Sequence, residues 1–149
     1  MTSSLGGLLH TVASGPKPLI AAVHECRNAE TLTELIQGAQ SGHEIWSTLV
    51  ASSGDGVVYR LASVFPISER AARFKELVQV SRVWVHQELQ GWSMEGQRGW
   101  DVTWRWLVLD ENVRATLLQT TWNASGVIEV VPPLPWNEVT VRRPALFED

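Results

Sequence analysis

The chain of 149 residues is 44% hydrophobic and 19% charged, with a net charge of −4. A chain of this length buries roughly two-thirds of its unfolded surface, so it needs neither disulfides nor metals to fold. The composition excludes a disordered chain, and the mildly acidic balance argues against a surface that binds nucleic acid through its phosphates. A single cysteine, Cys26, excludes a disulfide framework and any site that needs several thiolates.

The sequence carries no targeting or membrane signal that we recognise. No basic residue precedes the short apolar stretch near Met1, and no long apolar run follows it, so a signal peptide is not expected. No window approaches the ~18 consecutive apolar residues of a membrane span. With one thiol, the expected compartment is the reducing cytoplasm.

The first part of the chain predicts an arm and two helices. Residues 1–15 show no clear period and predict a flexible arm or a short docking helix, ahead of a single domain over 16–149. An apolar run at helical spacing follows two prolines and predicts a helix that reaches Cys26. The capping box Thr31-Leu32-Thr33-Glu34 predicts a second helix over about 31–40.

The pattern around residue 50 allows two interpretations. Segments 44–51 and 57–65 are rich in β-formers and flank Ser52-Ser53-Gly54-Asp55-Gly56, whose glycines favour a hairpin turn. A capping box that starts at Ser41 would instead begin a helix over 43–52. The β-branched content favours the hairpin.

The rest of the chain predicts one more helix and then strands. Ser68 is a good N-cap for a helix over 69–78, and strands follow at 79–91, 100–109, 113–122, 126–131 and, after three prolines, at an edge near 138–143. This order predicts an α+β fold with helices packed on a curved, mostly antiparallel sheet of five to seven strands. In element order it is similar to the NTF2-like cone, which encloses a pocket between a bent sheet and its helices.

Eight tryptophans are the unusual feature of the composition, and most lie in the predicted long strands. Trp100, Trp104 and Trp106 share one parity, so one face of their strand is aromatic. Such a face belongs either to a core or dimer contact, or to the wall of a concave ligand pocket.

A second feature is the alternation in Arg82-Val83-Trp84-Val85-His86-Gln87-Glu88-Leu89, which places the charged and aromatic members on one face. A histidine and a carboxylate on one pleated face can act as general base and orienting acid, with an arginine to stabilise negative charge. If Leu89 pairs with Val102, then His86 and Glu88 share a face with Asp101, Thr103 and Arg105. A register shifted by one residue instead sets His86 against Trp104 or Trp106. Solvent-facing charge pairs would give the same pattern.

No motif predicts a cofactor. The chain has no HExxH, no zinc-deaminase cysteine pair, no phosphate-binding glycine loop, no dinucleotide fingerprint and no Gly-x-Ser-x-Gly elbow. Cys26 lies on an apolar segment and is better explained as a buried hydrophobe than as a nucleophile.

Two functions from different classes remain. The first is a cofactor-independent pocket protein, acting as an isomerase, cyclase or lyase on a hydrophobic or aromatic small molecule. Its catalytic residues would be His86, Glu88 and Asp101, and its ligand-binding residues Arg82, Trp84, Trp104, Arg105 and Trp106. The second is a non-catalytic protein-interaction domain, such as an adaptor, a chaperone-like factor or an immunity-type inhibitor, with a Trp- and Arg-rich sheet face. The mixture of polar and aromatic residues on the same strands favours the first. A homodimer is compatible with both, and neither predicts nucleic acid or membrane as a partner.

Overall fold

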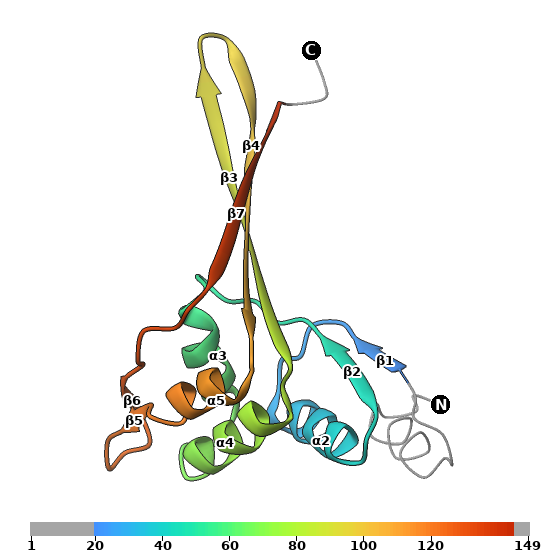
Figure 1. The fold of residues 1–149 in the computed structure, drawn as a ribbon, viewed down its shortest axis with the longest axis vertical. Coiled ribbons are helices and arrows are strands. Elements are labelled where there is room, and N and C mark those ends of the chain that lie inside the picture. The colour runs from blue at the N-terminus through green and yellow to red at the C-terminus, as the bar shows by residue number, and fades with distance from the viewer. Residues whose placement is uncertain (1–19, 145–149) are drawn as a thin grey trace.

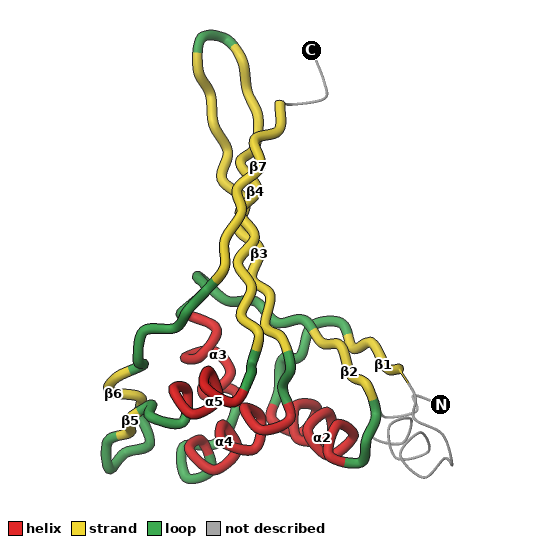
Figure 2. The backbone as a smooth tube through the Cα atoms, viewed as in Figure 1, coloured by secondary structure: helices red, strands yellow, loops and turns green. Residues whose placement is uncertain are grey.

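The computed structural model describes residues 20–144, which form a helical base and a long projecting stalk (Figure 1). The stalk is the three-stranded antiparallel sheet of β3 (Val83–Met94), β4 (Gln97–Val108) and β7 (Asn137–Pro144), with β4 in the centre. Helices gather at one end of this sheet and loops join them to the stalk (Figure 2). The arm predicted over 1–15 lies outside the described residues.

The first described unit is a β–α–β crossover. Strand β1 (Ile20–Val23) pairs in parallel with β2 (Glu44–Ser47), and α2 (Ala29–Gln40) connects them. The predicted second helix is confirmed, although Asn28 rather than Thr31 is its N-cap and accepts a hydrogen bond from the Thr31 amide at 2.9 Å. The predicted helix reaching Cys26 is wrong, because the crossover supplies β2 as a strand partner that local spacing cannot reveal.

The predicted hairpin around residue 55 is also wrong. The segment after the glycines is helix α3 (Gly56–Val64), and its Gly56 amide donates to the Ser53 hydroxyl at 2.9 Å. The buried members of this helix include Val57, Val58 and Leu61, which repeat at helical spacing. β-Branched residues misled the sequence prediction here, since packing against the core outweighs the weak β-propensity.

Two further helices complete the base. Helix α4 (Arg70–Val80) confirms the prediction over 69–78, with Glu69 rather than Ser68 as its N-cap. Helix α5 (Glu111–Leu117) occupies the first half of the segment 113–122 that predicted a strand. Asp110 begins α5, because its carboxylate accepts a hydrogen bond from the Val113 amide at 2.9 Å. A short pair of strands, β5 (Thr121–Trp122) and β6 (Ile128–Val130), lies beside the helices.

The hydrophobic core joins the four described helices to the root of the stalk. Buried side chains include Ile36 of α2, Val58 of α3, Val78 of α4 and Leu117 of α5, and the stalk contributes Trp84 and Leu107. Helix α4 also contacts the small β5–β6 sheet through Phe74, whose ring meets Trp122 edge-on at 5.8 Å between centroids. Burial of these residues is therefore what anchors the stalk to the base.

The α+β class is confirmed, but the predicted sheet is not. Among the described residues the sheets have three, two and two strands, and none of them curls or closes. The expectation of a curved sheet of five to seven strands, similar to the NTF2-like cone, is therefore wrong. Of the predicted strands, 57–65 is a helix, 113–122 is half helix, and 44–51 and 126–131 pair outside the main sheet, so the three strands left are too few to enclose a pocket.

The long hairpin itself is confirmed together with its register. Leu89 pairs with Val102, as one of the two sequence interpretations required, and β7 joins as the predicted edge strand with Val141 opposite Val102. The chain reverses at Glu95 and Gly96, which both have positive φ (51° and 81°). Two successive left-handed residues match the type I′ turn that suits the twist of a hairpin.

Candidate functional site

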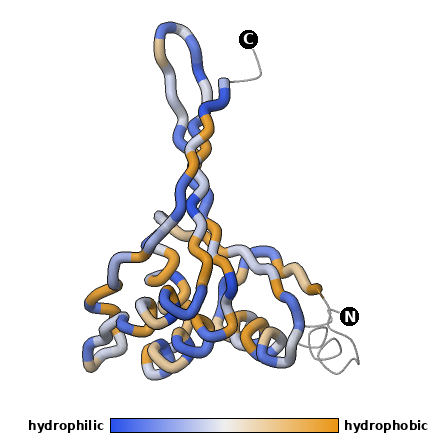
Figure 3. The backbone as a smooth tube through the Cα atoms, viewed as in Figure 1, coloured by the Kyte–Doolittle hydropathy of each residue, from blue (hydrophilic) through white to orange (hydrophobic). Residues whose placement is uncertain are grey.

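The register of the stalk sorts its side chains onto two faces of different character. Residues directly opposite each other in antiparallel strands share a face. Odd positions of β3, even positions of β4 and odd positions of β7 thus form one face, and the remaining positions form the other. Figure 3 shows hydrophobic and hydrophilic residues alternating along these strands, as two such faces require.

The first face, here called the apolar face, carries ten apolar side chains: Val83, Val85, Leu89, Trp100, Val102, Trp104, Trp106, Val108, Val139 and Val141. The same parity also places Gln87, Ser93, Arg98, Asn137 and Arg143 on it. Nine of the ten are exposed, and Val102 is half-buried. The most exposed tryptophan is Trp100, at 54%, and even Val83 and Val108 at the root remain about half exposed. None of the four described helices buries these nine side chains.

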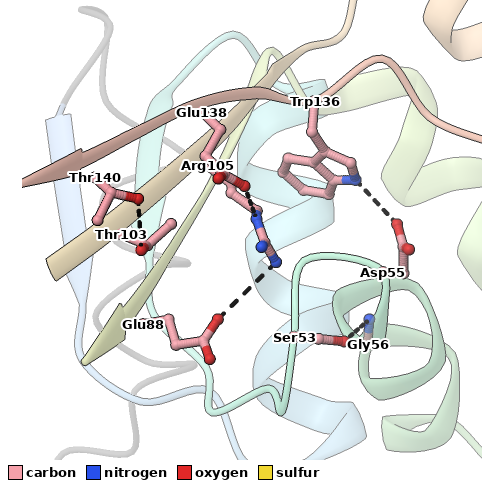
Figure 4. Close-up of polar contacts among 9 residues, drawn as sticks. All are labelled: Ser53, Asp55, Gly56, Glu88, Thr103, Arg105, Trp136, Glu138 and Thr140. Atoms are coloured by element: carbon pink, nitrogen blue, oxygen red, sulfur yellow. Dashed lines mark hydrogen bonds and ion pairs between the residues drawn. The ribbon is translucent and has the colours of Figure 1, made fainter. Parts of the chain in front are cut away.

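The second face, here called the polar face, is organised around ion pairs and hydrogen bonds. The Arg105 guanidinium donates to the Glu138 carboxylate on β7 at 2.5 Å and lies 3.9 Å from the Glu88 carboxylate on β3 (Figure 4). One row further along, the hydroxyls of Thr103 and Thr140 are 2.9 Å apart. Cross-strand pairs of this kind are a common means of stabilising a sheet surface.

Arg105 also connects the stalk with the loop before α3. A Cβ at Gly54 would lie 3.4 Å from the Arg105 Cδ and 3.5 Å from the Trp136 ring, so the loop packs directly against both. The Trp136 indole nitrogen donates to the Asp55 carboxylate at 3.1 Å, as Figure 4 shows. Because Trp136 immediately precedes β7, these contacts hold that strand to the base. The pKa of the Arg105 guanidinium is raised by its hydrogen bond to Glu138.

Nearer the tip, Arg142 binds Asp101 with two hydrogen bonds of 2.9 Å each. This bidentate pair lowers the pKa of the Asp101 carboxyl, with the hydrogen bond as the main cause. The Arg142 guanidinium also lies 5.2 Å from the centre of the Trp92 ring. Trp92 fits in this position because its cross-strand neighbour, Gly99, has no side chain. A Cβ at Gly99 would lie 2.4 Å from the indole. The arginines on this face are therefore paired with acidic side chains of the same sheet.

The structure brings together only some of the eight predicted site residues. His86, Glu88, Asp101 and Arg105 share the polar face, as the Leu89–Val102 register required. Glu88 and Arg105 form an ion pair, while Asp101 is two positions from Thr103 and pairs with Arg142 instead.

His86 lies at the root of this face, only 8% exposed, and its Nδ1 has no hydrogen-bond partner among residues 20–144. Trp84 is buried in the core beside it in the strand. Arg82 precedes β3, and its carbonyl accepts a hydrogen bond from the Leu109 amide at 2.8 Å. Trp84 and Arg82 therefore each have a structural role in the base that does not depend on a functional site.

Trp104 and Trp106 lie on the opposite face from His86 and Glu88. The sheet thus separates two of the three predicted aromatic ligand-binding residues from the predicted acid–base residues, and the third, Trp84, is buried in the core. Two surface hollows, of about 440 Å³ beside α3 and about 410 Å³ near the stalk tip, are both lined by other residues.

Sequence reasoning missed the contribution of β7 to both faces. Glu138, Thr140 and Arg142 complete the polar face, and Val139 and Val141 widen the apolar one. The alternation in this segment was visible and predicted an edge strand. Its pairing with β4 was not, because a partner some forty residues away in the chain leaves no local signal.

Within residues 20–144, no group of three or more histidine, cysteine or acidic residues is arranged to hold a metal ion. None of the described helices is long and apolar enough to cross a membrane. Cys26 is 2% exposed in the core, where burial raises the pKa of its thiol.

Comparison with known proteins gives a structural likeness. No protein-family model and no curated protein sequence matches this chain. Among solved structures, it is similar to the ATPase DotB of Legionella pneumophila, with a TM-score of 0.63 and 28% identity over 78% of this chain. It is also similar to DotB of Yersinia pseudotuberculosis, with the same TM-score and 22% identity over 76% of the chain. The match covers 31% and 28% of those two proteins, so this chain resembles their N-terminal domain and not the whole ATPase.

Proposed function

We propose that this chain is a non-catalytic protein-interaction domain that binds its partner through the apolar face of the stalk. The observation that carries the proposal is the exposure of nine contiguous apolar side chains on a sheet that projects from the base. Monomeric soluble proteins rarely expose an apolar patch above a few hundred Å², and larger ones mark interaction sites. Tryptophan, of which this face has three, is among the residues that most often dominate binding energy.

The polar face supports the same choice. Its arginines are paired with Glu138, Glu88 and Asp101 inside the sheet, so their charges are already compensated. A pocket enzyme would need the aromatic and the acid–base residues around one cavity, but Trp104 and Trp106 lie on the opposite face from His86 and Glu88, and Trp84 is buried in the core. The sequence-based proposal of a small-molecule enzyme stays a prediction, to be checked by the turnover of His86→Ala and Glu88→Ala variants.

The likeness to DotB supports a role as one part of a larger assembly. Each DotB protein is an ATPase about three times the length of this chain, and only one domain of it is matched. The present sequence has no phosphate-binding glycine loop, so ATP hydrolysis is not part of the proposal. The proposed partner is a cytoplasmic protein.

The test is affinity purification of the tagged full chain from its own host, as wild type, Trp104→Ala and Trp46→Ala. Trp46 is the matched control because it is equally aromatic and more exposed, at 58% against 39%, but lies on β2 in the base. We expect Trp104→Ala to weaken a stoichiometric complex by about 2 kcal/mol, or roughly 30-fold, and Trp46→Ala to leave it unchanged. A complex that is indifferent to substitutions at Trp100, Trp104 and Trp106 would contradict the proposal.

A further inference from the structure

We propose that the partner of the apolar face is a second copy of this chain, packed face to face with the two stalks antiparallel. This inference rests on the proposed function, because it names the occupant of the same surface. Four features of the structure support it: the area of the face, its lack of charge in the middle, the charges at its two ends, and its openness from root to tip.

The area matches what a stable dimer needs. The three tryptophans are 54%, 39% and 36% exposed, which at ~250 Å² per ring amounts to about 320 Å². The six exposed aliphatic side chains are between 39% and 60% exposed. At roughly 100 Å² for a fully exposed side chain, they together add about 300 Å². A standard interface buries about 800 Å² per partner, of which roughly 60% is apolar. The ~600 Å² available therefore exceeds the ~480 Å² required.

The centre of the face is self-complementary because it carries no charge. Its middle rows are Gln87–Trp104–Val139 and Leu89–Val102–Val141. Burying a charge without a partner costs several kcal/mol, and packing the middle of this face against a second copy buries no charge. Two sheets that pack in this way form a sandwich about 10 Å thick.

The ends of the face decide the orientation. The residues of β3, β4 and β7 together hold four arginines and three acidic side chains, but the charges on the apolar face are only Arg98 and Arg143, both towards the tip. No ion pair within the described residues involves either of them. A parallel dimer would bring these cations against their own copies, and like charges in contact destabilise an interface.

An antiparallel dimer removes this repulsion. A two-fold axis between Val102 and Trp104 sets Trp104 against Val102 of the second copy, and Trp106 against Trp100 of that copy. Arg98 then lies over Val108 of the second copy, next to the acidic start of α5, where Asp110 and Glu111 follow directly in the chain. Because Val83 and Val108 are about half exposed, the root of each stalk is open to the tip of the other.

The experiment is sedimentation equilibrium of the purified full chain. We expect a species of twice 16.6 kDa at about 10 µM and above. Trp104→Asp should raise the dissociation constant at least 100-fold, while the control Trp46→Asp should change it less than threefold. Far-UV circular dichroism of each variant shows that it is folded, and Val102→Lys is a second variant on the same axis should Trp104→Asp not fold.

Mixing tests the orientation. Trp104→Glu and Val102→Lys should each be monomeric alone and should form a heterodimer together, since the antiparallel arrangement places the new carboxylate opposite the new amine. Failure of the mixture to associate would overturn the antiparallel arrangement. A wild-type chain that stays monomeric, or a dimer unaffected by Trp104→Asp, would overturn the self-association.

The proposed function can fail or survive separately. A monomeric chain that loses a stoichiometric complex with a different purified protein on Trp104→Asp overturns the second copy as partner and leaves the interaction surface standing. If no complex of either kind depends on this face, both proposals are refuted.

Discussion

Trp84→Ala tests most sharply how the tryptophans are divided between the core and the surface. Trp84 is 9% exposed at the root of the stalk, where it belongs to the core cluster with Leu107. At ~250 Å² for a full ring it removes roughly 200 Å² from water, worth about 5 kcal/mol as an upper limit. Aromatic side chains truncated in cores usually cost 3–5 kcal/mol. We expect a loss of about 4 kcal/mol in the free energy of unfolding.

The matched control is Trp46→Ala. Trp46 is 58% exposed on β2, so the same calculation gives at most about half the loss, and we expect 1–2 kcal/mol. The assay is urea unfolding, read by far-UV circular dichroism at low protein concentration so that association does not contribute. Equal losses for the two variants, or a loss below about 1 kcal/mol for Trp84→Ala, would refute the assignment of Trp84 to the core.

Three further outcomes follow from local contacts. Asp110→Ala removes the N-cap of α5 and should cost about 1 kcal/mol of stability in the same unfolding assay, with no change in the slope. In a carbon-detected NMR titration, the carboxyl of Asp101 should titrate below its ordinary pKa; the Arg142 pairing is then present above that value and is lost as the pH falls through it, and Arg142→Gln should return the pKa towards normal. Cys26 should resist a soluble thiol reagent in the native state and react fully in urea, because burial raises the pKa of its thiol and blocks access. In the folded protein the thiol stays neutral until the pH rises through that raised pKa. Rapid native modification would contradict its burial.

The long hairpin could be predicted because its signals are local. Alternation along β3 and β4 extends over many residues and predicts two long strands, but it left two registers open, of which the structure has the one that pairs Leu89 with Val102. The separation of the polar residues from the tryptophan stripe was one of the two outcomes that the sequence allowed.

The elements that failed are those decided by distant contacts. β1 is a strand because α2 carries β2 alongside it, and α3 is a helix because Val58 and Leu61 pack into the core. α5 could have been recognised, since Asp110 is a good N-cap and Val113 and Leu117 have helical spacing. The neighbouring β-formers outweighed that signal in the sequence prediction.

In the candidate site, too, the features set by local alternation could be predicted and those set by distant contacts could not. One of the two registers that the sequence left open places His86, Glu88, Asp101 and Arg105 on one face, and the structure has that register. It could not show that β7 supplies a second acidic partner for Arg105, nor that the apolar face would be left uncovered. Both depend on where a distant strand and the helical base come to rest.

The most direct test of this account is the register of the stalk, on which both faces depend. An NMR spectrum of isotopically labelled protein, at a concentration where it is monomeric, reports which side chains are neighbours across the strands. We expect the Trp104 ring protons to show cross-peaks to the methyl groups of Val139, and His86 to show them to Arg105. Cross-peaks that instead join Trp104 to His86 would mean a register shifted by one residue. The tryptophans would then share a face with His86 and Glu88, and the face described here as apolar would not exist.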